Sequence, residues 1–140
     1  MQALTLIQPF GWALFHGKPV ENRSWAPPAG IIGQRIAIHA GKRYDREGEL
    51  FVCRQLGLER LPDEVHRQGV IGTAIIDRAI DEQLVADPLM DSPWFSGPWG
   101  WVLRDVRELE RPIACKGMLG LWRLPAALEA ALAGQLKLSA

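Results

Sequence analysis

The sequence predicts an α+β protein built on a small mixed β-barrel of five or six strands, with short helices at its periphery. Short apolar, β-branched or alternating segments typical of strands recur along the 140 residues, at positions 3–7, 20–25, 31–40, 70–80, 99–106 and 119–124. The helical segments between them are too few for the crossover connections of a doubly wound parallel sheet. No repeat, low-complexity tract or long linker interrupts the chain, so we expect one domain over residues 1–140.

Short helices are expected from their boundary residues. Each begins at a first-turn proline or after a capping aspartate, and ends at a glycine, which can take the left-handed conformation that stops a helix. The carboxy-terminal helix should open at Pro125 and stop at Gly134. The other two should cover residues 9–16 and the segment between Asp45 and Gly57, where the helix would close one opening of the barrel.

Charge is balanced overall but unevenly distributed. The 16 Lys and Arg residues offset 16 Asp and Glu residues and the pI is near 6.8, so no global field attracts polyanions. The first 46 residues are nevertheless basic, with six Lys or Arg residues, Arg35 and Arg46 among them, against only Glu21 and Asp45. Any contact with nucleic acid should therefore be local and involve this region.

Metal and redox chemistry lack their sequence signals. Cys53 and Cys115 form no CxxC motif, and neither follows a signal peptide, which predicts reduced thiols in a cytoplasmic protein. His16, His39 and His66 show no ligand spacing, so no metal is expected. Motifs for nucleotide cofactors are missing and no apolar run is long enough to span a membrane, so we expect neither a cofactor nor a membrane contact.

The first candidate cluster lies in the predicted strand at 20–25. Because alternate residues of a strand share a face, Glu21, Arg23 and Trp25 should project together, with Lys18 at the mouth of the strand. Unpaired buried charges cost several kcal/mol. This face therefore either lines a cleft or contains an internal Glu21–Arg23 pair, and both possibilities stay open.

The second candidate cluster follows the next strand. We expect that strand to end at His39, in a glycine turn that carries Lys42 and Arg43. Basic side chains position a nucleic-acid backbone. The alternative is a turn that is merely solvated.

Tryptophan is abundant, with six residues in the chain. Those on predicted strands should pack in the core. Trp94 and Phe95 lie in a loop rich in Gly and Pro, where they either hold the loop down or offer a stacking platform for a base.

Several blocks in order resemble the ASCH domain family, which has a PUA-like fold, and in particular its small bacterial and phage members. Residues 17–25 are similar to the family's GxKxxExR signature through Lys18, Glu21 and Arg23. The other similar blocks are residues 4–10, 39–43, 97–101 and 116–122.

The resemblance implies a cleft between the barrel and its first helix, and a role in binding RNA or a nucleotide. Glu21 would accept hydrogen bonds from a base edge or orient Arg23. The side chains that would contact nucleic acid are Lys18, Arg23, Trp25, His39, Lys42, Arg43 and Trp94. A protein partner is a further possibility.

The alternative is an enzyme. Some small ASCH proteins are amidohydrolases acting on N4-acylated cytidine through a lysine, a threonine and a glutamate, and others have been proposed to be ribonucleases. Lys18 matches the lysine, Glu21 stands at the threonine position, and only Asp77 lies near the position of the strand glutamate. Because that triad is not preserved, we keep as an alternative an amidohydrolase or ribonuclease in which Lys18 and Glu21 are catalytic.

Overall fold

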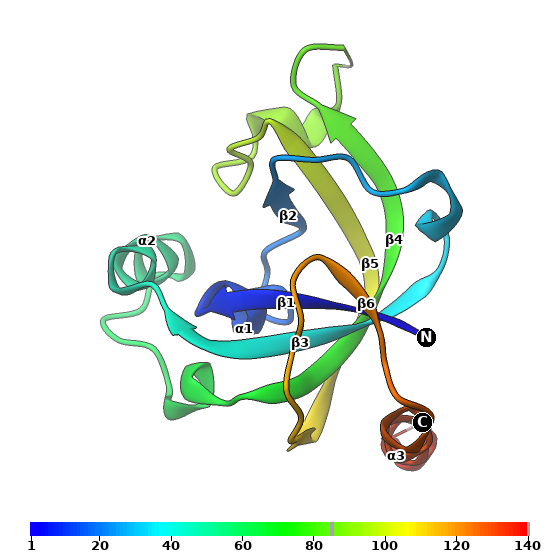
Figure 1. Ribbon diagram of the computed structural model, residues 1–140. Coiled ribbons are helices and arrows are strands. Elements are labelled where there is room, and N and C mark those ends of the chain that lie inside the picture. The colour runs from blue at the N-terminus through cyan, green and yellow to red at the C-terminus, as the bar shows by residue number, and fades with distance from the viewer. Residues whose placement is uncertain (85, 140) are drawn as a thin grey trace.

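The computed structural model describes residues 1–84 and 86–139 and shows one mixed six-stranded sheet (Figure 1). The strand order is β2-β5-β4-β3-β1-β6, in which β1 and β3 are parallel and the other neighbours are antiparallel. The predicted α+β class, with a small barrel-like sheet of five or six strands, is confirmed. The strands are β1 (Gln2–Gln8), β2 (Val20–Arg23), β3 (Arg35–Tyr44), β4 (Gly69–Asp81), β5 (Trp99–Ile113) and β6 (Leu121–Arg123).

The sheet curls into a half-barrel that is open along one seam. The two longest strands, β4 and β5, are paired with three register shifts, and such irregularities bend a sheet. Pairing of β1 with β6 ends at Leu4, so the second half of β1 faces the seam. Arg23 of β2 bridges it, because its Nη2 donates to the backbone oxygen of Thr5 at 2.9 Å.

Both faces of the central strands are buried. On the inner face, Ile36 and Ile38 pack with Trp101, as the alternation of β3 predicts. On the outer face, Ala37 packs with residues of the carboxy-terminal helix, of which Leu132 is fully buried. This double burial explains the nearly continuous apolar sequence of the central strands.

The described residues form three α-helices, α1 (Phe10–Ala13), α2 (Arg46–Leu56) and α3 (Ala126–Ser139). α1 and α3 pack on strands of the sheet, and α2 packs on α1. The predicted boundaries of α2 are confirmed, since Asp45 Oδ1 accepts from the Gly48 amide at 2.9 Å and Gly57 adopts φ +67°. Single 3-10 turns occur at Ala29–Ile31, Asp63–His66 and Pro88–Asp91.

The prediction that Gly134 ends the last helix is wrong. α3 continues through it to Ser139. Leu132 and Leu136, on either side of this glycine, both pack against the outer core. Their burial outweighs the cost of about 1 kcal/mol for a glycine inside a helix.

The predicted glycine turn after His39 is also wrong. β3 begins at Arg35 rather than residue 31 and runs on to Tyr44, which pairs with Gln8 of β1. A Cβ atom added at Gly41 would lie 3.4 Å from Cγ2 of Thr5, so β3 passes close to β1 at this glycine. Pairing with β1 thus carries β3 past a residue that, taken locally, predicts a turn.

Candidate functional site

The signature residues form one buried ionic cluster. Gly17, at φ +117°, turns the chain after α1 and directs Lys18 inward, where its side chain is 4% exposed. Lys18 Nζ donates to Glu21 Oε1 at 3.1 Å, and Arg23 Nη2 lies 3.4 Å from Glu21 Oε2. The sequence left open whether this face forms an internal ion pair or lines a cleft. In the structure Glu21 does both, because it pairs with Arg23 and also lines a cavity.

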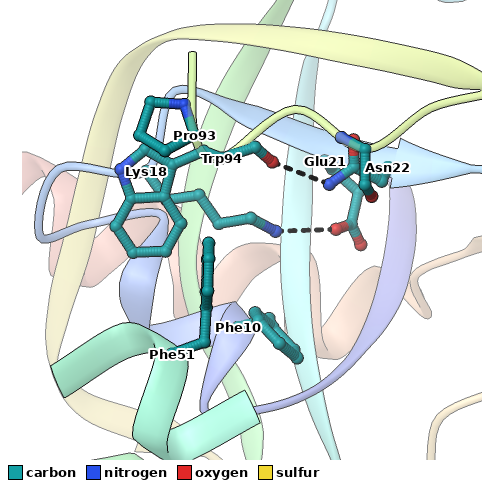
Figure 2. A pocket seen from close by; sticks show the side chains of 8 residues that line it. Phe10, Lys18, Glu21, Asn22, Phe51, Pro93 and Trp94 are labelled. Carbon is teal, nitrogen blue, oxygen red and sulfur yellow. Dashed lines mark hydrogen bonds and ion pairs between the residues drawn. The ribbon is translucent and has the colours of Figure 1, made fainter. Parts of the chain in front are cut away.

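This cavity, here called the first hollow, has a volume of about 370 Å³. Figure 2 shows the Lys18 side chain extending toward Glu21 among aromatic rings. Its ammonium lies 5.0 Å from the centre of the Phe10 ring, within the range of a cation–π contact. The lining residues are Phe10, Lys18, Glu21, Asn22, Phe51, Pro93, Trp94 and Ser96.

The ionic cluster keeps unused hydrogen-bond donors. It contains two cations and one carboxylate, and Glu21 occupies only one of the three N–H groups of Lys18. Arg23 Nε is buried and has no partner among the described residues. A ligand with an oxygen acceptor in the first hollow would pair with the N–H groups that Lys18 leaves unused, whereas Arg23 does not line this hollow.

Asn22 fixes the loop that forms one wall of the first hollow. Its Nδ2 donates to the Trp94 backbone oxygen at 2.9 Å, and its Oδ1 accepts from the amides of Ser96 at 3.0 Å and Gly97 at 3.3 Å. Trp94 in turn meets Phe51 of α2 edge-to-face, with ring centres 5.5 Å apart. The Trp94 loop is thus held down and also presents a ring to the cavity.

The other residues considered from the sequence lie apart from the first hollow. Trp25 is half-buried and packs edge-to-face on Trp101 at 4.8 Å, and it does not line the cavity. Asp77 pairs with Arg78 and Arg104 outside it. Glu21 is thus the one carboxylate among its described lining residues.

His39 and Lys42 line a different cavity, here called the second hollow, of about 760 Å³. Arg43 is exposed and lines neither hollow. Of the predicted residues, Lys18, Glu21 and Trp94 line the first hollow and His39 and Lys42 the second, whereas Arg23, Trp25 and Arg43 line neither. The second hollow is lined by Thr5, His39, Ala40, Gly41, Lys42, Gln68, Gly69, Cys115, Lys116, Gly117, Met118 and Leu119.

His39 has both ring nitrogens engaged within the protein. Nε2 lies 2.9 Å from the Cys115 carbonyl oxygen, which can only accept, so Nε2 carries the proton. Nδ1 then accepts from Thr5 Oγ1 at 3.2 Å, and Thr5 Oγ1 accepts from Trp122 Nε1 at 3.0 Å. This closed network assigns His39 to holding the loop at Cys115 and leaves it no free nitrogen for a ligand.

Other titratable groups near the hollows are poorly suited to nucleophilic chemistry. Burial raises the pKa of the Cys115 thiol, which disfavours the thiolate. Burial and the hydrogen bond to Glu49 raise the pKa of Tyr44 well above its ordinary value. Within residues 1–84 and 86–139, no three His, Cys, Asp or Glu side chains are grouped to hold a metal ion.

Several residues that line the first hollow carry no functional motif in the sequence. Phe51 lies in the apolar stripe of α2, which predicts core packing, and Asn22 carries no motif of its own. The one local signal for Asn22 is its position, because an amide side chain is unusual inside a strand and this one stands between Glu21 and Arg23.

The half-barrel fold is also found in solved structures of ASCH proteins. ASCH from Zymomonas mobilis is 20% identical, with a TM-score of 0.53 over 95% of this chain and 93% of that one. A tyrosine-to-phenylalanine variant of that protein is 20% identical to this chain, with a TM-score of 0.53 over 95% of this chain and 96% of the variant. A serine-to-alanine variant is 19% identical, with a TM-score of 0.52 over 95% of this chain and 94% of the variant.

The chain has the fold of ASCH proteins, and the resemblance inferred from the sequence is confirmed at that level. No family model matches the sequence, and no curated protein matches it. Among the described residues, no helix is long and apolar enough to cross a membrane.

Proposed function

We propose that the protein is an RNA- or nucleotide-binding module in which the first hollow holds a nucleobase. The observation that carries this proposal is the buried Lys18–Glu21 pair, 3.1 Å apart, at the wall of a cavity of about 370 Å³ that three aromatic rings also line. Ligand cavities commonly combine apolar walls with a few placed polar groups. A nucleobase matches both features, with flat apolar faces and a polar edge.

The polar groups suit the edge of a base. The remaining N–H groups of Lys18 can donate to a ring nitrogen or carbonyl, and Glu21 can accept from an exocyclic amine. Trp94 and Phe51 provide ring surface for the faces of the base. Stacking of this kind is worth about 1 to 3 kcal/mol per base.

The remaining predicted residues take supporting roles in this proposal. Arg23 orients Glu21 and closes the seam through Thr5. Trp25 supports Trp101 beneath the cluster. Lys42 and Arg43 contact phosphates outside the first hollow, and the free thiols of the chain fit a cytoplasmic setting.

Binding of nucleosides tests the proposal. Quenching of tryptophan fluorescence should saturate as common ribonucleosides and short RNA are added, because Trp94 lines the hollow. Lys18→Met should weaken nucleoside binding at least tenfold, since about 1.4 kcal/mol corresponds to that factor. If no nucleoside or RNA quenches fluorescence, or if Lys18→Met binds like wild type, the first hollow is not a base site.

The alternative function is hydrolysis of a modified nucleoside or of RNA. It is favoured by the burial of Lys18 beside a carboxylate, an arrangement in which a lysine can act as base and Glu21 as its partner. Incubation with N4-acylated cytidine and with RNA, followed by chromatography, tests it. Product formation that Lys18→Met abolishes would establish an enzyme, and absence of product with intact binding would leave the binding module.

A further inference from the structure

The second hollow carries an unbalanced positive charge. Lys42 lines it from β3 and Lys116 from the segment between β5 and β6, and its described lining contains no Asp or Glu. Both lysines are exposed, and neither belongs to an ion pair in the part of the chain that the structure describes. Like charges gathered on a concave surface focus the field and attract an anion.

The two hollows are neighbours. Arg23 contacts Glu21, which lines the first, and Thr5, which lines the second. β1 also connects the two hollows. Thr5 of the second hollow lies about 10 Å from Gln8 at the end of the strand, as calculated from the rise of an extended chain. Phe10, which lines the first hollow, follows Gln8 by two residues. The two hollows therefore lie beside each other along β1.

The loop that borders the second hollow is anchored at its base and apolar at its tip. His39 holds the Cys115 carbonyl oxygen, and a Cβ at Gly117 would approach the His39 ring to 2.5 Å. Beyond this anchor, Met118 is 63% exposed and Leu119 is 98% exposed. Exposed apolar side chains beside cations are typical of contact surfaces, and apolar wedges pack between bases in several nucleic-acid complexes.

We propose that the second hollow is a subsite for the phosphate backbone of a single strand of nucleic acid whose base occupies the first hollow. Lys42 and Lys116 bind phosphates, and Met118 and Leu119 pack against a neighbouring base. The inference rests on the function proposed for the first hollow. A single strand is expected because a base must leave its stack to enter the first hollow, and unstacking costs least when the base is not paired in a duplex.

The test compares wild type with a Lys42→Ala, Lys116→Ala double variant. Affinities are measured for ribonucleosides and for RNA and DNA oligonucleotides of about eight residues, the order of the site size of small single-strand-binding folds. Nucleoside affinity should stay unchanged, because neither lysine lines the first hollow. For the oligonucleotides, the slope of log affinity against log salt should become shallower by about 1.4 on loss of two phosphate contacts.

When the salt concentration rises fourfold, this difference in slope means that the affinity of wild type should fall by a factor about sevenfold larger than the affinity of the variant. A double variant with Arg60→Ala and Arg111→Ala removes the same charge from exposed sites outside both hollows and should keep the wild-type slope. The RNA and DNA arms show which strand is preferred.

Three results would overturn the inference. The first is an unchanged slope in the Lys42, Lys116 variant, which would leave the surface to another partner such as a protein. The second is an equal effect of the control variant, which would indicate general charge attraction. The third is nucleoside affinity that falls together with oligonucleotide affinity. Failure of wild type to bind nucleosides would instead refute the function proposed for the first hollow.

Discussion

A thermodynamic cycle on Lys18 and Glu21 tests the ionic cluster most directly. The single variants Lys18→Met and Glu21→Gln each leave a charge with one partner fewer, in a site where Lys18 is 4% and Glu21 10% exposed at the side chain. Breaking a fully buried pair costs roughly 3 to 5 kcal/mol. The cost is smaller here, because Arg23 lies 3.4 Å from Glu21 and because the hollow is open to solvent. We therefore expect each single variant to lower the free energy of unfolding by about 2 to 3 kcal/mol.

The double variant should cost less than the sum of the two. Replacing both partners of a buried pair is often nearly neutral, but here Arg23, 20% exposed, still loses its carboxylate, so part of the cost remains in the double variant. We expect a coupling energy of about 2 kcal/mol between the two positions, measured from urea unfolding at neutral pH.

The exposed pair of Glu64 and Arg67 is a matched control. These side chains are also three residues apart, but they lie 3.9 Å from each other and are 44% and 38% exposed. The equivalent cycle there should give a coupling energy below about 1 kcal/mol. If the effects of Lys18→Met and Glu21→Gln add within about 0.5 kcal/mol, the two side chains do not form the pair described and the argument for the cluster fails.

The remaining predictions concern the surroundings of both hollows. Asn22→Ala removes three hydrogen bonds to the Trp94 loop and should cost about 1.5 to 3 kcal/mol in urea unfolding and weaken nucleoside binding, whereas Ser24→Ala, at an exposed position of the same segment, should do neither. Gly117→Ala should destabilise by about 1 to 3 kcal/mol, because its methyl group would meet His39 and Thr5, and unaltered stability would refute the closeness of this contact. The Arg78 guanidinium and the Leu89 amide lower the pKa of Asp87 from 3.8 to about 2, so the stabilisation from this carboxylate is fully present above about pH 4 and is lost as the pH falls through 2. Asp87→Asn should therefore destabilise at pH 7 and converge with wild type near pH 2, and a difference that persists at pH 2 would contradict this cause.

Local signals along the chain were sufficient for much of the fold. Asp45 and Gly57 delimit α2 because a capping side chain and a left-handed residue act within one helical turn. The alternation of Ile36 and Ile38 likewise defines the inner face of β3 without knowledge of its partners. The grouping of Lys18, Glu21 and Arg23 could likewise be predicted from local sequence, because these residues lie within one short segment.

Other features depend on partners distant in the sequence. β3 passes Gly41, and α3 passes Gly134, because pairing with β1 and burial of leucines outweigh local preferences. The separation of His39 and Lys42 from Lys18 follows from the curl of the sheet, which depends on register shifts between β4 and β5.

The sequence by itself therefore determined the class of fold, the boundaries of α2 and the chemistry of the signature cluster. Only the tertiary structure decided that Asn22, Phe51 and Trp94 enclose that cluster, and that a second, positively charged hollow lies beside it. The physical reason is range. Caps, turns and periodicity act over a few residues, whereas a cavity forms where segments far apart in the chain meet, and its shape is set by the packing of the whole sheet.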